Sequence, residues 1–292
     1  MRFSIIGISY NNAYRESLRT FLNELIRSGD QVAIYDKFRD LIDADIPELA
    51  HVKVFSESDD IASETDCFIS IGGDGTFLHA VQFTRDSGVP ILGLNTGRLG
   101  YLTAAPITDA VSAIGKIRTG DYIIEPRSLL RVDSKEDIFG RMNFALNDFT
   151  IHKKDSASMI TIHVHIDGVF LNSYWGDGLI ISTPTGSTAY SLSCGGPIIA
   201  GECGVFAVTP IAPHNLNVRP VVISEESVIT LTAETRNQNY LAVLDSRSES
   251  VDQPVEFTIR KERFSVNMVR FTGTGFAETI RGKLYWGLDR RN

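Results

Sequence analysis

The chain has 292 residues, 43% of them hydrophobic and 22% charged, which is ordinary for a globular protein of one large or two modest domains. Its formal net charge of -8 argues against a nucleic-acid binder, because binding to a phosphate backbone normally needs a basic face. The three cysteines have no CxxC spacing and no apolar run approaches the ~20 residues of a membrane helix, so we expect a cytoplasmic protein with free thiols and no membrane partner.

Short apolar strands alternate with helical patterns from residue 1 to about residue 125. The predicted strands are Phe3 to Ile8, Val32 to Tyr35, Cys67 to Ile71 and Ile91 to Leu94. Asn11 or Asn12 is a candidate cap for the first helix, and Gly29 is predicted to end that helix. Strand-helix alternation of this kind predicts a parallel sheet covered on both faces, with ligands at the carboxyl ends of the strands.

The pattern changes from about residue 126 to one typical of antiparallel strands. Met159 to Ile166 alternates strictly between apolar and polar residues, and Asp167-Gly168 is predicted to make a hairpin turn into the next strand. Further strands are predicted at Val169 to Leu171, Val221 to Ile223, Val228 to Thr232, Leu241 to Leu244 and Val255 to Arg260. The stretch from Thr272 to Trp286 lacks this alternation and is predicted to return to the first domain.

The most specific local feature is the sequence GGDGT at 72–76, which follows an apolar strand and precedes a helix. Glycines allow the backbone to approach a ligand closely, and exposed amides at a helix N-terminus favour phosphate. Asp74 within such a site would accept a proton from an attacking hydroxyl or bind a metal ion that bridges phosphates. The alternative is a tight turn stabilised by an Asx-type hydrogen bond. The motif is not a Walker P-loop, because no Gly-Lys-Ser/Thr follows it.

A second cluster of glycines and hydroxyl side chains runs from Asp177 to Pro197. Its composition cannot form a core and is typical of a loop that presents hydroxyls and amides to a polar ligand, although a purely structural loop remains an alternative. His214 is either a pocket residue or, more commonly for a single histidine, a structural one. His163 and His165 fall on the solvent face of a predicted strand.

These motifs resemble those of the NAD kinase family. GGDGT looks like the phosphate-binding signature of NAD kinases, which diacylglycerol kinases, sphingosine kinases and phosphofructokinases share more loosely. The further elements that resemble the family are Asn95 to Leu102, Asn147-Asp148, Asp177 to Pro197, Pro213-His214 with Leu216 and Arg219-Pro220, and Lys283-Leu284 with Trp286. They occur in the family's order from about residue 71 to residue 286, so the resemblance covers nearly the whole chain.

The resemblance implies a transfer of the γ-phosphate of ATP to the 2′-hydroxyl of the adenosine ribose of NAD, which gives NADP. Asp74 would be the general base, and Gly72, Gly73, Gly75 and Thr76 would surround the ATP phosphates. The NAD-binding residues implied are Asp74, Gly75, His79, Asn147, Asp148, Asp177, Thr188, Ala189, Tyr190, Ser191, Leu192, Ser193 and, as a hypothesis, Arg247. Tyr190 would pack against a base, a role that suits an aromatic ring.

The sequence departs from the family pattern at several positions. Many members have glutamate in place of Asp148, an arginine in place of Trp175 and a basic residue near Ser158. Asp245-Ser246 replaces a frequent Asp-Gly turn, and Arg247 is a hypothetical source of the positive charge that the other positions lack.

The resemblance also implies the domain architecture, the cofactor and the assembly. We expect a Rossmann-like N-terminal α/β domain (1-125, with a C-terminal return of 271-292) and a C-terminal β-sandwich domain (126-270). We further expect dependence on Mg²⁺ or Mn²⁺ and a homodimer or homotetramer formed through the β domain. Two alternatives stay open: a lipid kinase of the diacylglycerol or sphingosine type, which shares only GGDGT, and a non-catalytic NAD-binding sensor.

Overall fold

The computed structural model describes residues 1–42, 46, 49, 52–56, 61–97, 100–154, 159–236, 239–271 and 276–284. The chain divides into two compact units, unit 1 with residues 1–126 and 266–292 and unit 2 with residues 127–265. The long strands β7 (Ile123–Asp133) and β18 (Glu256–Arg270) have residues in both units. Within the described residues, no helix is long and apolar enough to cross a membrane.

Unit 1 contains a parallel sheet, in which the strand order is β18-β5-β4-β1-β2-β3. Its remaining strands are β1 (Arg2–Ile6), β2 (Gln31–Tyr35), β3 (Lys53–Phe55), β4 (Cys67–Ile71), β5 (Ile91–Asn95) and the short β6 (Ala105–Pro106). Strands β4 and β5 are buried along their full length, as expected for a parallel sheet covered on both faces. The predicted parallel sheet is therefore confirmed.

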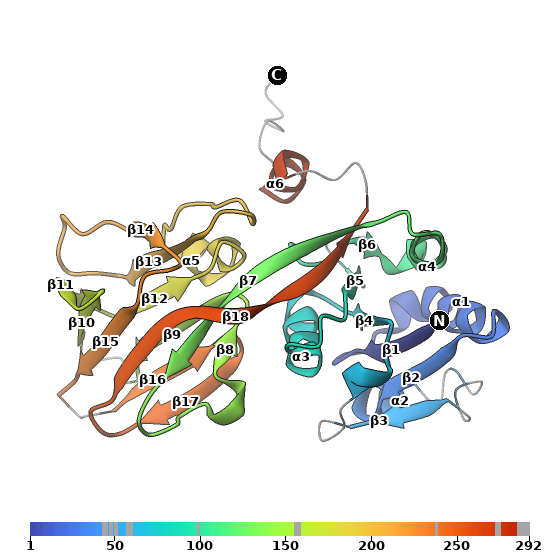
Figure 1. Cartoon of the computed structure of the whole chain (residues 1–292), viewed down its shortest axis with the longest axis horizontal. Coiled ribbons are helices and arrows are strands. Elements are labelled where there is room, and N and C mark those ends of the chain that lie inside the picture. Colours follow the sequence, from blue (N-terminus) through green and yellow to red (C-terminus); the bar gives the residue numbers. More distant parts are fainter. Residues whose placement is uncertain are drawn as a thin grey trace. The chain divides into compact units, whose positions relative to one another are not determined.

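Helices cover both faces of this sheet. They are α1 (Arg15–Arg27), α2 (Asp36–Ile42), α3 (Asp74–Thr84) and α4 (Ala110–Thr119), with short 3₁₀ turns at Asn12–Tyr14, Ile61–Glu64 and Ile107–Asp109. A further helix of unit 1, α6 (Phe276–Leu284), follows β18 in the chain. Figure 1 shows α3 on one face and α1 with α4 on the other. The predicted helix signals hold, because the Asn11 side chain accepts a hydrogen bond from the amide of Ala13 and Gly29 adopts φ +72 after α1.

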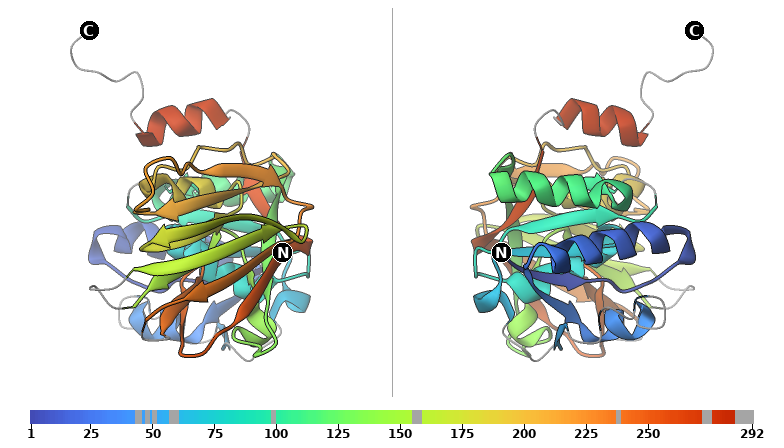
Figure 2. Two further views of the ribbon diagram at one scale, coloured as in Figure 1. Left: turned by 90° about the vertical axis from the view of Figure 1, so that its left-hand side faces the viewer. Right: turned by 90° about the vertical axis from the view of Figure 1, so that its right-hand side faces the viewer.

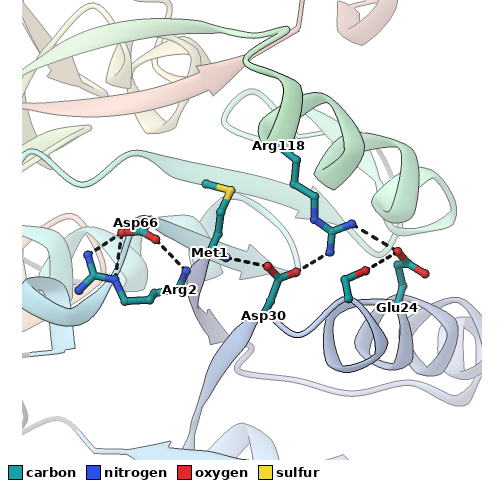
Figure 3. A network of polar contacts seen from close by, with 7 residues as sticks. Met1, Arg2, Glu24, Asp30, Asp66 and Arg118 are labelled. Carbon is teal, nitrogen blue, oxygen red and sulfur yellow. Dashed lines mark hydrogen bonds and ion pairs between the residues drawn. The ribbon is translucent and has the colours of Figure 1, made fainter.

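Ion pairs connect the amino ends of the unit 1 strands to its helices (Figure 3). The Met1 amine lies 2.8 Å from Asp30 Oδ1, and Arg118 of α4 donates to both Asp30 and Glu24 of α1. Burial opposes ionisation of Asp30, but these two cations hold the pKa of its carboxyl below the usual value. The network therefore links β1, the turn before β2, and helices α1 and α4.

Unit 2 consists mainly of two antiparallel sheets. One has the order β11-β10-β15-β18, with β10 (Ile160–Ile166), β11 (Val169–Gly176) and β15 (Ile229–Glu234). Strand β7 pairs with β18 and with the short β8 (Phe144–Ala145). The left view of Figure 2 faces this sheet, with β10 and β11 in yellow-green. The other has the order β14-β13-β12-β9-β16-β17, made of β9 (Asp148–Lys153), β12 (Gly178–Ser182), β13 (Val205–Ile211), β14 (Val221–Ser224), β16 (Tyr240–Leu244) and β17 (Arg247–Val251).

A single buried core joins the inner faces of these two sheets. Ile162 and Phe257 of the first sheet belong to the same hydrophobic cluster as Ile151 and Val208 of the second. The predicted β-sandwich is thus confirmed, and its alternating strand is correct in detail, because Ile160, Ile162 and Val164 of β10 are all fully buried. Helical turns occur only briefly in the described part of this unit, at Gly140–Met142, Gly186–Thr188 and α5 (Tyr190–Ser193).

Candidate functional site

The GGDGT segment joins β4 to α3, as the sequence predicts. A Cβ added to Gly72 would overlap the side chain of Thr76, which is 2% exposed, so only glycine allows this close approach. Gly73 and Gly75 have no neighbouring atom near the position of a Cβ, and both are exposed. The first turn of α3 therefore leaves backbone accessible for an anion at the positive end of the helix dipole.

The carboxylate of Asp74 holds the turn that follows the next strand. Its Oδ2 accepts a hydrogen bond of 2.8 Å from the amide of Tyr101, and its Oδ1 accepts one of 2.9 Å from the amide of Leu102. A Cβ on Gly100 would overlap Oδ1, which explains the glycine at that position. The contact arises because β4 and β5 are adjacent parallel strands, so their carboxyl ends lie at the same edge of the sheet.

Arg270 fixes the same turn from its carbonyl side. Its guanidinium donates to the carbonyl oxygens of Tyr101 at 2.8 Å and Thr103 at 3.1 Å, and it pairs with Glu125 at 2.9 Å. The Gly100 amide also donates to Thr103 Oγ1 at 3.1 Å. The segment 100–103 is thus held by Asp74 through its amides and by Arg270 through its carbonyls.

His79, one of the predicted NAD-binding residues, packs into an aromatic cluster of unit 1. Its ring centroid lies 5.7 Å from that of Tyr35 in an edge-on arrangement and 5.7 Å from that of Phe83. The side chain is half-buried one turn after Gly75 on α3. Part of the ring therefore has a packing role, and its expected contact with NAD stays a prediction.

Asn147 and Asp148 stand at the start of β9 in unit 2, and a second aspartate anchors them. The carboxylate of Asp245 accepts hydrogen bonds from the amides of Leu146 at 2.9 Å, Asn147 at 2.8 Å and Asp148 at 3.2 Å. The carbonyl of Asp148 in turn accepts from the Asp245 amide at 3.0 Å. Asp245 therefore sets the position of the predicted Asn-acid pair.

The carboxylates of Asp148 and Asp245 both have raised pKa values. Burial is the main cause that raises the pKa of Asp148 to about 7, the negative charge of Asp245 adds to it, and the Thr150 hydroxyl, which donates at 3.2 Å, opposes it. Burial of the Asp245 carboxylate likewise raises its pKa, while hydrogen bonds from three backbone amides and the positive charge of Arg247 lower it. Asp148 therefore titrates near neutral pH.

The segment after β12 packs directly on Asn147. The Thr183 amide donates to the Asn147 carbonyl at 2.9 Å, and the Thr183 hydroxyl donates to the carbonyl of Leu146 at 2.5 Å. A Cβ on Gly186 would overlap the Asn147 carbonyl, so glycine is required there. The structure thus brings Asn147, Asp148 and the segment 183–188 together within unit 2.

The residues 188–193 differ in how far they are available to a ligand. Ser191 is fully buried, and its hydroxyl bonds that of Thr209 at 2.9 Å. Tyr190 is 42% exposed and Ser193 is exposed, while Thr188, Ala189 and Leu192 are half-buried. Tyr190 and Ser193 therefore have surface free for contact with a ligand, whereas Ser191 supports the turn from inside.

Asp177 has a partner that the sequence analysis missed. Lys153 Nζ of β9 lies 2.6 Å from Asp177 Oδ1, and the Lys153 amide donates to the Asp177 carbonyl at 2.9 Å. The ring centroid of Trp175 lies 4.4 Å from that of His214. Lys153 thus provides a positive charge near this part of unit 2, and no motif in the sequence indicates the pairing.

Arg247 is engaged with the backbone of unit 2. Its guanidinium donates to the carbonyls of Met142 and Phe144, and burial lowers its pKa. Its hypothetical role as a positive charge for the substrate would compete with these hydrogen bonds and stays a prediction. Ser158, Arg98, Leu99 and Trp286, which the sequence analysis also named, lie outside the described residues.

Comparisons with known proteins agree with this arrangement. The chain matches the ATP-NAD kinase N-terminal domain over residues 50–122 and the ATP-NAD kinase C-terminal domain over residues 146–271. It is 41% identical over 293 residues to a protein named NAD kinase from Cytophaga hutchinsonii and 42% identical over 294 residues to one from Flavobacterium psychrophilum, with 100% of each chain covered in both cases.

Two solved structures are similar over almost the whole chain. Yeast NADH kinase complexed with NADH gives a TM-score of 0.85 at 24% identity, covering 99% of this chain and 89% of that one, and supports the fold alone. An NAD kinase from Archaeoglobus fulgidus in complex with ATP gives 0.71 at 27% identity, covering 97% and 99%. With two domain matches in the expected order and relatives of about 40% identity along its full length, the chain belongs to the NAD kinase family.

Proposed function

We propose that this protein transfers the γ-phosphate of ATP to the 2′-hydroxyl of the adenosine ribose of NAD, giving NADP and ADP. The observation that carries the proposal is the Asp74 carboxylate at the first turn of α3, directly between two exposed glycines. A carboxylate beside a phosphate-binding helix end is repulsive towards ATP unless it acts on the acceptor or a metal ion, and the family supplies an acceptor hydroxyl.

The reaction needs one proton acceptor and one phosphate cradle. The ribose oxygen forms a bond to the γ-phosphorus, the bond from that phosphorus to the β,γ-bridging oxygen breaks, and the hydroxyl proton moves to Asp74. Each carboxylate oxygen of Asp74 accepts one backbone hydrogen bond and retains a second acceptor position for that proton. The amides of Gly73, Gly75 and Thr76 would bind phosphate oxygens.

Unit 2 would bind the dinucleotide. Asn147 and Asp148, fixed by Asp245, would hydrogen-bond its ribose hydroxyls, and the Asp177 carboxylate beside Lys153 would receive the amide of its nicotinamide. The exposed ring of Tyr190 would pack against a base. In this assignment the ribose contact depends on the ionised form of Asp148.

The nucleotide would enter as its complex with a divalent metal ion. Among the described residues there is no group of three His, Cys, Asp or Glu side chains that would hold a metal ion by itself. Mg²⁺ usually keeps several waters and binds through substrate phosphates with one or two carboxylates. The donor set therefore suits a metal ion delivered with ATP, for which Asp74 is the nearest carboxylate to the phosphate loop.

We further propose a cytoplasmic homodimer or homotetramer formed through unit 2. Cys67, Cys194 and Cys203 form no disulfide, which suits a reducing compartment. Light scattering at catalytic concentrations measures the assembly directly. A fully active monomer at those concentrations would contradict the oligomer.

One assay tests the reaction. Purified protein is mixed with ATP, Mg²⁺ and NAD, and NADP is detected through an NADP-specific dehydrogenase. We expect NADP to form, with no phosphorylation of diacylglycerol, sphingosine or fructose 6-phosphate. Lipid phosphorylation without NADP would favour the lipid-kinase alternative, and NAD binding without turnover would favour the sensor.

A further inference from the structure

Lys283 of α6 has a buried ammonium group without a polar partner among the described residues. Its Nζ is inaccessible to solvent and makes no hydrogen bond to any residue that the structure describes. The ammonium instead lies 4.1 Å from the centroid of the Tyr101 ring. The hydroxyl of Tyr101 is also buried and has no hydrogen-bond partner among the described residues.

Burial of the Lys283 ammonium without an anion costs free energy. A buried ammonium loses its hydration, and a single aromatic face compensates only part of that loss. Arg270, another largely buried cation of unit 1, is by contrast paired with Glu125 and with two carbonyls. Lys283 differs from Arg270 in having donors available for a ligand.

The position of Lys283 links it to the phosphate loop. The residue it covers, Tyr101, donates its amide to the carboxylate of Asp74 at 2.8 Å. Asp74 and Lys283 interact electrostatically, and the same is true of Asp74 and Tyr101. GGDGT itself contains no lysine or arginine, so the phosphate loop lacks the cation that phosphoryl transfer normally uses.

We propose that Lys283 is a catalytic residue whose ammonium binds the β- or γ-phosphate of ATP beside Asp74. This rests on the proposed function and adds a residue that stands some 200 positions after the phosphate loop. Lys283 stays protonated throughout and neutralises charge on the transferred phosphoryl group, while the hydroxyl proton goes to Asp74. The Tyr101 ring below holds the ammonium in place until ATP binds.

The charge state of Lys283 supports this role. Burial is the main cause that lowers its pKa to about 8, the carboxylate of Asp74 opposes that shift, and the Arg270 guanidinium adds to it. On α6 itself, Glu278 and Arg281 pair with each other at 3.6 Å, and Glu125 is bound to Arg270. The ammonium thus predominates at neutral pH, and a bound phosphate would stabilise it further.

The test compares Lys283→Met with Lys116→Met. Methionine keeps an unbranched apolar stem on an aromatic ring and removes only the charge. Lys116 is a matched control because its Nζ also lies over an aromatic ring of the same unit, 5.0 Å from the centroid of Phe271. Calorimetry measures binding of a non-hydrolysable ATP analogue and of AMP, which lacks the β- and γ-phosphates.

We expect Lys283→Met to weaken binding of the ATP analogue by about 10- to 100-fold, the range for a hydrogen bond to a charged group. Binding of AMP should stay within about twofold, and Lys116→Met should leave both unchanged. Lys283→Arg should restore most of the affinity for the analogue. In the wild type, that affinity should fall as pH rises above about 8, and the fall should disappear in Lys283→Met.

A purely structural role gives different results. If Lys283 only holds α6 against Tyr101, Lys283→Met lowers Tm. It then weakens binding of the ATP analogue and of AMP equally, or changes neither affinity. If Lys283 binds phosphate, the Tm of Lys283→Met without nucleotide equals or exceeds that of the wild type. The rise of Tm on adding the ATP analogue is then smaller in Lys283→Met than in the wild type. Unchanged affinity for the analogue in a folded Lys283→Met, or in the wild type between pH 7 and pH 9.5, overturns the proposal. Absence of NADP formation by the wild type would overturn the proposed function instead, since the calorimetry does not depend on turnover.

Discussion

The Asp74 carboxylate combines a structural and a chemical task. It accepts hydrogen bonds from two backbone amides of the 100–103 turn, which is the behaviour expected of a turn-forming residue. In the proposed reaction it also stands where a proton acceptor is needed. Asparagine retains one acceptor oxygen, but its NH₂ group would face an amide donor and break one of the two bonds. Loss of activity in Asp74→Asn alone would therefore mix both effects.

A matched pair of variants separates them. We expect Asp74→Asn to lower kcat by on the order of 10²-fold or more, because general-base help is typically worth about 10²–10⁴-fold, while NAD affinity stays within about tenfold. Thr103→Val removes the hydroxyl that accepts from the Gly100 amide and so loosens the same turn without altering Asp74. Stopped assays give kcat and calorimetry gives the Kd of NAD. A comparable loss in Thr103→Val would mean that turn geometry, and not proton transfer, explains the effect.

Asp148 should give NAD binding a pH dependence near neutrality. If its ionised form binds the ribose, KM for NAD falls about tenfold between pH 6 and pH 8, the arithmetic for one carboxyl that titrates at about 7. Asp148→Asn should flatten the profile. Thr150→Val, which removes the donor that lowers the pKa, should move the profile to higher pH. A profile that is identical in Thr150→Val and the wild type would show that another group titrates.

The same residue predicts how stability varies with pH. The folded pKa of Asp148 lies above its unfolded value, so the folded protein binds the extra proton and loses stability as pH rises from about 4 to about 7. Above that range, Asp148→Asn should therefore be more stable than the wild type, by on the order of 1–4 kcal/mol. Urea unfolding at pH 5 and pH 8 measures this, and an Asn variant that is less stable at pH 8 would contradict the assignment.

At the scale of elements, the end of β18 anchors the turn that Asp74 holds. Arg270→Gln removes two hydrogen bonds to carbonyls and leaves Glu125 without its ion-pair partner. We expect a loss of about 1–3 kcal/mol of stability, together with a lower kcat, because the turn and Asp74 are held together. Thermal unfolding and the coupled assay measure both quantities.

The control for this prediction lies on the same strand. Arg260 pairs with Asp133 at 2.8 Å, but its side chain is more exposed than that of Arg270, and exposed pairs contribute about 0–1 kcal/mol. Arg260→Gln should therefore change Tm little and leave kcat unchanged. Equal effects of the two substitutions would indicate a general role of β18 in stability instead of a specific one at the turn.

At the scale of the whole molecule, its acidic charge bears on the requirement for metal. A chain with a net charge of -8 and a phosphate loop without a basic residue needs a cation to bind triphosphate productively. We expect EDTA to abolish NADP formation and Mg²⁺ or Mn²⁺ to restore it. Folding should not change, since no metal-binding group of three His, Cys, Asp or Glu side chains occurs in the described ranges. Full turnover in metal-free buffer would contradict the proposal.

The two-unit organisation also shows where sequence patterns were sufficient. Most predicted strands in both halves recur with ends shifted by at most about two residues, since burial of one face or both faces imposes a period that can be read directly. The strand predicted at Val169 to Leu171 extends to Gly176. The strand predicted at Val255 to Arg260 extends to Arg270, and unit 1 resumes at residue 266 within it. A strand shared by two units has no composition change at the boundary, which is why the sequence placed the boundary at 270.

The sequence by itself determined the two fold classes, the glycine-rich turn between β4 and α3, and the family, because these rest on local periodicity and on short motifs of residues close together in the chain. Only the tertiary structure decided which side chains meet across long separations: Asp74 with the amides of Tyr101 and Leu102, Asp245 with Asn147 and Asp148, and Lys153 with Asp177. Lys283 belongs to the same group, since its proximity to Tyr101 has no signal in the sequence. The physical reason is that adjacent strands, and not adjacent residues, place these groups together, and their burial, which sets the pKa of Asp148 and Lys283, exists only once the chain is folded.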